Sequence, residues 1–170
     1  MGISRWIHSQ AEQYRHGEDR PLGGYVALMS IYSGSTLVGT LAAKRWGRGM
    51  PRPVSAWEFA QLVLATQKVA RLLTKDPVTS PIRAPFTSYD RNSAPGELTD
   101  QVRAHSPLGH AAGELLTCPM CMGQWVATAF SVGLVAVPTF TRAVLTTFSA
   151  AAGADFLQHL YVWLQQASED

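Results

Sequence analysis

Long stretches without charge constrain the fold of this chain more than any other feature. One covers Leu22–Ala43 and a second covers Leu115–Thr141, and neither contains an Asp, Glu, Lys or Arg. A third covers Ala143–Gln166 and has Asp155 as its single formal charge. A helix that crosses a bilayer needs about 20 mostly apolar residues, and each stretch supplies them. The pattern therefore predicts an all-α integral membrane protein.

The three stretches predict transmembrane helices over residues 22–43, 118–140 and 143–166, after a polar N-terminal segment of residues 1–21. Charged residues make up 15% of the chain, against roughly 25% in soluble domains. Small residues interrupt the first stretch, but bilayer helices pack through such residues. The alternative is a soluble bundle in which these are buried core helices. Such a bundle would be expected to carry more charged helix faces.

The charges beside the first stretch predict an orientation. Seven cations flank it, three before and four after: Arg5, Arg15, Arg20, Lys44, Arg45, Arg48 and Arg52. Short basic loops favour the cytoplasmic side of a membrane. Residues 44–117 are therefore expected on the cytoplasmic face.

Residues 55–73 predict an amphipathic helix within that segment. Ser55 and Glu58 have the spacing of a capping box. Apolar residues recur at helical spacing on one stripe: Phe59, Leu62, Val63, Thr66, Val69, Ala70 and Leu73. Such a helix lies in the headgroup plane or packs against the other helices. A fourth membrane crossing is the remaining alternative.

A proline-rich loop is predicted after this helix. Pro77, Pro81 and Pro85 each block helix continuation. Residues 74–107 are therefore expected to form turns and loop, with the polar run 93–100 mobile. Within this loop Asp76 and Arg83 could pair. Arg83 could instead meet a lipid phosphate or stay solvated.

Cys118 and Cys121 stand at the expected start of the second span, and Pro119 suits a first helical turn. Because a helix N-terminus stabilises a thiolate, the pair is a redox candidate. Simple packing of two small side chains is the interpretation that we favour. With His105 and His110 the pair also supplies four potential zinc ligands, although their spacing matches no standard zinc finger. No other cofactor is expected.

Asp155 and His159 lie one helical turn apart in the third stretch. An ionisable group inside a membrane span is costly, so such groups mark proton relays, ligand sites or contacts between helices. We favour a contact between Asp155 and one serine of the first stretch. The candidates are Ser30, Ser33 and Ser35.

Composition and motifs narrow the function. A formal net charge of +2 argues against a nucleic-acid binder, and two cysteines exclude a disulfide-stabilised scaffold. No glycine-rich phosphate loop, Ser-His-Asp arrangement or paired-carboxylate motif stands out. The sequence favours a non-enzymatic membrane component that binds lipid, a membrane protein partner or a second copy of itself. A membrane thiol–disulfide oxidoreductase that uses Cys118 and Cys121 is the alternative.

Three segments together resemble one protein family. They are ARLLTKDPVTSPIRAPF at 70–86, GELLTCPMCMGQWVATA at 113–129 and AAGADFLQHLY at 151–161. They are similar to segments of domain-of-unknown-function family 1360, whose members are bacterial integral membrane proteins. The resemblance implies a multi-pass protein of the bacterial cytoplasmic membrane and gives no activity. It also implies a set of motif positions: Arg71, Asp76, Thr79, Pro81, Arg83, Cys118, Pro119, Cys121, Trp125 and Asp155. Among these, Asp76, Arg83 and Trp125 are candidates for contact with the membrane face or a ligand.

Overall fold

The computed structural model describes residues 2–15, 20–46, 53–104 and 106–169. Its elements follow in chain order: α1 (Ile3–Arg15), α2 (Leu22–Trp46), α3 (Ala56–Lys75), the 3-10 helix η1 (Pro77–Thr79), α4 (Ser80–Arg83), β1 (Thr87–Ala94), β2 (Glu97–Val102), α5 (Pro107–Thr117), α6 (Pro119–Ala136) and α7 (Pro138–Glu169).

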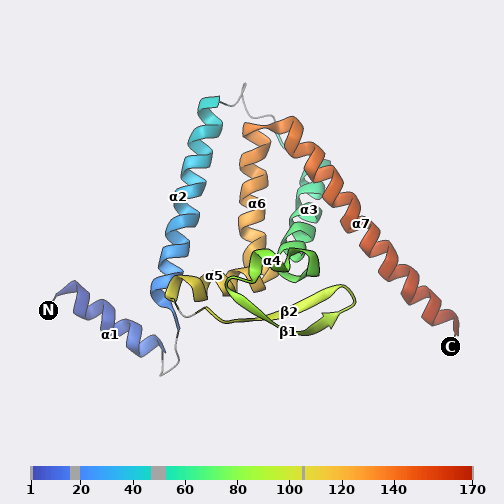
Figure 1. The fold of residues 1–170 in the computed structure, drawn as a ribbon. Helices are drawn as coiled ribbons and strands as arrows, with labels where there is room; N and C mark the ends of the chain where they lie inside the picture. Colours follow the sequence, from blue (N-terminus) through green and yellow to red (C-terminus); the bar gives the residue numbers. More distant parts are fainter. Residues whose placement is uncertain (1, 16–19, 47–52, 105, 170) are drawn as a thin grey trace.

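Four long helices form the body of the molecule. Helices α2 and α6 run in one direction, whereas α3 and α7 return in the other (Figure 1). Helix α6 contacts α2, α3 and α7, and α3 packs along both α6 and α7. The elements between α3 and α6 gather at one end of these helices, where α2 and α6 begin and α3 ends (Figure 1). We call residues 77–117 the cap.

Within the ranges that the structure describes, two helices are long and apolar enough to cross a membrane. They cover Leu22–Arg45 and Pro119–Ala136, and only 6% and 11% of their most apolar windows are buried inside the protein. Helix α7, which contains the third predicted span, does not meet the same criterion of length and composition within the part of the chain that the structure describes. The prediction of three spans is therefore supported for the first two only.

The expectation of an all-α fold with a proline-rich loop is wrong for residues 77–102. This segment forms η1, α4 and a two-stranded antiparallel hairpin, in which Thr87 pairs with Val102 and Ala94 pairs with Glu97. Pro95 and Gly96 make the turn, and Gly96 has a φ of 75°, which glycine adopts without strain. The strands escaped prediction because β1 is almost entirely polar and has no apolar alternation.

Helix α3 lies close to the bounds of the helix predicted over residues 55–73. Ser55 is its N-cap, and the Ser55 side chain accepts a hydrogen bond from the backbone N–H of Glu58 at 3.1 Å. One side of the helix is buried, since Ala70 packs with Met122 and Val126 of α6 in the core. The helix lies lengthwise against α6 and α7 and returns the chain to the end of the molecule where α6 begins (Figure 1).

Because α3 runs antiparallel to α2, the two ends of the segment 44–117 do not lie on the same face of the molecule, contrary to the prediction (Figure 1). The sequence placed them together on one face. In the structure the C-terminal end of α2 and the cap lie at opposite ends of the helices (Figure 1). A 20-residue helix spans about 30 Å, which is enough to separate the two.

Candidate functional site

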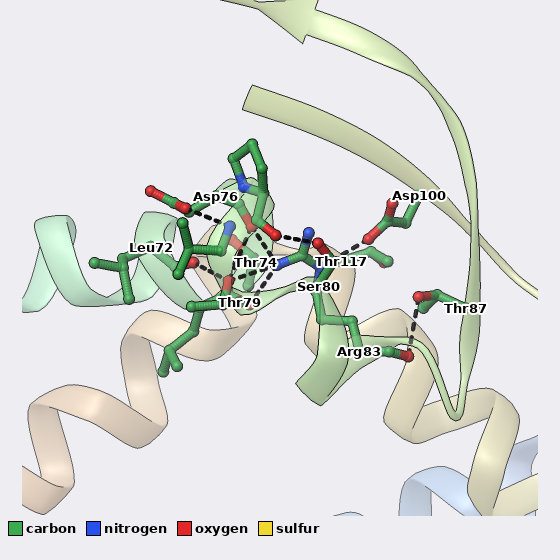
Figure 2. Close-up of polar contacts among 12 residues, drawn as sticks. Leu72, Thr74, Asp76, Thr79, Ser80, Arg83, Thr87, Asp100 and Thr117 are labelled. Carbon is green, nitrogen blue, oxygen red and sulfur yellow. Dashed lines mark hydrogen bonds and ion pairs between the residues drawn. The ribbon is translucent and has the colours of Figure 1, made fainter. Parts of the chain in front are cut away.

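A buried arginine organises the junction between α3 and the cap. The side chain of Arg83 has 0% exposure and lies opposite Asp100, which is 5% exposed (Figure 2). Nε of Arg83 donates to Oδ2 of Asp100 at 2.7 Å. Nη1 of Arg83 donates to Oγ1 of Thr79 at 2.7 Å and to the backbone carbonyls of Leu73 and Asp76, both at 3.1 Å. The guanidinium thus ties β2 to the last turn of α3.

The local sequence builds this arginine site by capping. Asp76 ends α3 and also begins η1, where its Oδ1 accepts a hydrogen bond from the N–H of Val78 at 2.8 Å. Thr79 Oγ1 donates to the carbonyl of Leu72 at 2.5 Å, and the same carbonyl accepts a hydrogen bond from the backbone N–H of Asp76 at 3.4 Å. Arg83 supplies further donors to the same helix end, where the dipole favours a cation.

The sequence-based interpretation of Arg83 differs from this geometry. Asp76 contacts Arg83 through its backbone carbonyl, and the carboxylate partner is Asp100. Asp100 was expected in a mobile run, but it lies in β2 and is almost fully buried. Because a guanidinium with 0% exposure reaches neither lipid nor bulk water, Arg83 supports the cap rather than the membrane face. No local motif marks Asp100; only the hairpin register brings it to Arg83.

The two cysteines lie at the junction of α5 and α6. Cys118 is the N-cap of α6, and its Sγ accepts a hydrogen bond from the N–H of Cys121 at 3.3 Å. Cys118 is half-buried and Cys121 is exposed. Burial by itself would raise the pKa of Cys118. Hydrogen bonds from Cys121 and from the N–H of Met120, together with the charge of Lys75, outweigh this effect and lower the pKa of Cys118 from its ordinary value.

The predicted zinc ligands are not brought together among the residues that the structure describes. His105 lies outside the described residues. His110 has its Nε2 3.6 Å from Oε1 of Glu114, a carboxylate that also accepts a hydrogen bond from the hydroxyl of Tyr25 at 2.5 Å. Across the described ranges, no three His, Cys, Asp or Glu side chains are grouped so that they could hold a metal ion.

Asp155 pairs with α3 and not with the serines of α2. Nζ of Lys68 lies 2.6 Å from Oδ2 of Asp155. Ser30 and Ser35 donate to carbonyls of α2 itself. His159 holds its Nδ1 2.7 Å from the backbone carbonyl of Asp155, one turn back in α7. The favoured interhelical contact therefore exists, but with a different helix.

A second ion pair joins the same two helices at their other end. Nε of Arg142, near the start of α7, donates to Oε1 of Glu58 at 2.6 Å. The pairs Glu58–Arg142 and Lys68–Asp155 thus fix the register of α3 against α7 along most of the length of α3. Both pairs join a charge on α3 to a charge of opposite sign on α7.

Trp125 lies on the α2 side of α6. Its ring meets the ring of Tyr32 edge to face, with centroids 5.1 Å apart. The Tyr32 hydroxyl lies 2.6 Å from Oγ1 of Thr128 and accepts a hydrogen bond from Nε2 of Gln124 at 2.9 Å. Trp125 therefore helps to attach α2 to α6, a contact that sequence reasoning did not predict.

A polar cleft lies between the end of α3, the tip of the hairpin and α7. Its volume is about 210 Å³. Six charged side chains and one histidine line it: Lys68, Arg71, Lys75, Asp76, Glu97, Asp155 and His159. Arg71 closes one side by donating to Oε1 of Glu97, from Nε at 3.0 Å and also from Nη2. Residues of two of the three resembling segments, 70–86 and 151–161, meet here.

An apolar groove lies between α3 and α6 and has a volume of about 480 Å³. Most of the residues that line it are aliphatic or small, among them Leu62, Val63, Gly123 and Ala127. Phe59 and Val63, which belong to the predicted apolar stripe of α3, stay more than half exposed here. The stripe is thus only partly covered by the protein.

The fold and these sites define a mostly helical protein that has two helices able to cross a membrane and a folded polar cap at one end. The chain belongs to the family described as "Protein of unknown function (DUF1360)", whose profile matches residues 61–161. The match runs from α3 into α7 and includes the whole cap, which confirms the family resemblance found in the sequence. No curated protein matches the chain. No solved structure matches it either.

Proposed function

We propose that the chain is a multi-pass protein of the bacterial cytoplasmic membrane whose cap binds a protein partner. The observation that carries the membrane assignment is the exposure of α2 and α6. Their most apolar windows are only 6% and 11% buried, so the protein itself does not cover them. Apolar surface on this scale is stable in hydrocarbon and unfavourable in water.

Helices α3 and α7 fit the same bilayer because they pair their charges with each other. The cost of an ionisable group inside a membrane falls when it faces a partner of opposite charge. Glu58–Arg142, in the first turns of α3 and α7, and Lys68–Asp155, toward the cap, provide such pairs at the two ends of the crossing. Four antiparallel crossings would put the cap on one side of the membrane and Lys44, at the far end of α2, on the other.

The cap suits docking of a partner because it is rigid. The buried Arg83–Asp100 pair and the capped helix ends hold it in one arrangement. Its surface presents the exposed hairpin, and the exposed thiol of Cys121 lies directly after the cap, in the first turn of α6. We propose a non-enzymatic binding role for this surface, with a membrane protein or a second copy as the partner.

Membrane extraction and sidedness test the proposal. We expect the protein to stay in the pellet after carbonate washing and to dissolve only with detergent. Sidedness is tested with an impermeant thiol reagent in intact cells. One sample is the protein with its native Cys121, and the other is Lys44→Cys in a background without Cys118 and Cys121. We expect the reagent to label only one of these two positions. A folded, monodisperse protein in the supernatant without detergent would overturn the membrane assignment.

Thiol–disulfide exchange is a second candidate, and the position of Cys118 favours it. We propose that the Cys118 thiolate attacks a disulfide of a partner protein, which forms a mixed disulfide and releases one partner thiol. Cys121 then loses its proton and attacks Sγ of Cys118, which releases the second partner thiol. The partner disulfide gains two electrons and two protons, and Cys118 and Cys121 become a disulfide.

The two cysteines can be told apart in a trapping experiment. In this mechanism Cys121→Ser accumulates a mixed disulfide with the partner, whereas Cys118→Ser does not. If both variants bind the partner equally and the complex survives a reducing agent, the partner docks without forming a disulfide. That result would contradict the redox mechanism. The helical content of each variant, measured by circular dichroism, shows that neither result comes from misfolding.

A further inference from the structure

We propose that the polar cleft between α3, the hairpin tip and α7 binds the zwitterionic headgroup of a phosphoethanolamine lipid. This inference rests on the proposed membrane location and adds a ligand class to it. The first argument is charge balance. Three cations line the cleft (Lys68, Arg71 and Lys75) and three carboxylates (Asp76, Glu97 and Asp155). A ligand that carries one charge of each sign suits such a lining better than a simple anion does.

The second argument is that donors and acceptors remain after the internal pairs are counted. Lys68 is engaged by Asp155, and Arg71 uses Nε and Nη2 on one oxygen of Glu97. Within the described ranges, no hydrogen bond or ion pair engages Nζ of Lys75 or Nη1 of Arg71. These two groups can donate to a phosphate with charge-assisted bonds.

Acceptors for the ammonium group of the ligand lie on the same walls. Glu97 gives only its Oε1 to Arg71, which leaves Oε2. Asp76 uses Oδ1 for the N–H of Val78, which leaves Oδ2. His159 has Nδ1 at the Asp155 carbonyl, so its Nε2 is the ring nitrogen left for a ligand. The cleft therefore offers separate partners for both charges of the headgroup.

The third argument is position. The cleft is lined by the last turns of α3 and by the hairpin tip. Both lie at the end of the helices where α2 and α6 begin (Figure 1), which is headgroup level for a protein that crosses the bilayer along these helices. Beside it, α7 continues past the end of α3 with apolar side chains that are at least half exposed: Phe156, Leu157, Leu160, Tyr161, Trp163 and Leu164. Trp and Tyr favour the membrane interface, so Tyr161 and Trp163 suit a position next to the lipid headgroups.

Native mass spectrometry of the full chain in detergent tests this inference. Phosphatidylethanolamine, phosphatidylglycerol and water-soluble phosphoethanolamine are titrated in separate arms. We expect phosphatidylethanolamine to bind more tightly than phosphatidylglycerol, and Lys75→Gln to weaken it about tenfold, the usual effect of losing one charge-assisted bond. Lys44→Gln, a cation at the opposite end of α2, is the matched control and should change nothing.

The outcomes separate the possible explanations. Equal binding of the two lipids, with loss in Lys75→Gln, would mean that the cleft recognises phosphate alone and would overturn the zwitterion assignment. Phosphoethanolamine that binds as well as the lipid would assign the site to a free metabolite and overturn the lipid. Unchanged binding in both Lys75→Gln and Glu97→Gln, each with wild-type helical content, would remove the cleft as the site. If the protein fractionates with membranes in that case, the proposed function survives and only this inference fails.

Discussion

Nε of Arg83 donates to Oδ2 of Asp100 over 2.7 Å, and both side chains are closed to solvent. The two residues are 17 positions apart and belong to different elements, α4 and β2. A buried guanidinium left without its carboxylate is strongly unfavourable, because the charge keeps its desolvation cost and loses its partner. This pair therefore joins α4 to β2 within the cap, and the hydrogen bonds from Arg83 to the carbonyls of Leu73 and Asp76 tie both elements to the end of α3.

The first prediction concerns the stability of this pair. Asp100→Asn keeps the shape and removes the charge, so we expect a loss of about 3–5 kcal/mol in the free energy of unfolding. The matched control is Arg91→Gln in the same hairpin, where Arg91 and Asp90 lie 3.5 Å apart and Arg91 is largely exposed. That change should cost less than about 1 kcal/mol. Denaturant titration in detergent, followed by circular dichroism, measures both; equal losses would contradict the structural role of Asp100.

The sequence allowed prediction of those elements whose signals lie within a short stretch of the chain. Ser55 and Glu58 marked the start of α3, and Pro119 marked the start of α6. Both are capping signals that act within one helical turn, so a short window of sequence contains them. The uncharged stretches likewise marked α2 and α6, because the composition of a stretch can be read without knowing which segments pack against it.

Contacts between distant segments could not be predicted in the same way. The partner of Arg83 depends on the hairpin register, and the strands of that hairpin have no apolar alternation to reveal them. Asp155 was assigned to the wrong helix because its partner depends on α3 returning between α6 and α7. Nothing near Asp155 in the sequence distinguishes Lys68 of α3 from a serine of α2.

The second prediction concerns the contact between α2 and α5. A Cβ atom at Gly24 would lie 2.0 Å from the backbone carbonyl oxygen of Pro107, whereas one at Gly23 would meet nothing within 4 Å. Gly24→Ala should therefore destabilise the protein by about 1–3 kcal/mol, as overpacking does. Gly23→Ala should be neutral or stabilise by up to about 1 kcal/mol, because alanine favours the helix. Thermal unfolding in detergent compares the two, and a neutral Gly24→Ala would contradict the close approach of α2 and α5.

The third prediction concerns the pH dependence of Cys118. Its pKa is lowered, so the thiolate forms at a lower pH than in an unfolded chain. Folding stability should therefore rise as the pH increases from the pKa of the folded state to that of an ordinary thiol, and it should fall when the pH drops through the folded pKa. Alkylation by iodoacetamide, followed by mass spectrometry of the Cys118 peptide, should show a midpoint below that of a free thiol.

Lys75 provides the variant for this measurement. Lys75→Gln removes one of the groups that lower the pKa of Cys118, so the alkylation midpoint should move to higher pH. Lys44→Gln, at the far end of α2, should leave it in place. A midpoint at or above that of a free thiol in the wild-type protein would contradict the N-cap role of Cys118 and would weaken the case for redox chemistry.

The fourth prediction compares the two ion pairs between α3 and α7. Glu58 is 7% exposed, whereas the side chain of Asp155 is 52% exposed. Glu58→Gln should lower the free energy of unfolding in detergent by about 1.5–3 kcal/mol, because it weakens a buried charge-assisted bond to Arg142. Asp155→Asn should cost less than about 1 kcal/mol if water reaches that pair. A loss that approaches that of Glu58→Gln would mean that Lys68 is left as an unpaired charge in an apolar medium, which would contradict the headgroup position of the cleft. The ratio of the two losses, measured by thermal unfolding of each variant, therefore reports whether the Lys68–Asp155 pair lies within the apolar layer or in the aqueous headgroup region where the proposed lipid site requires it.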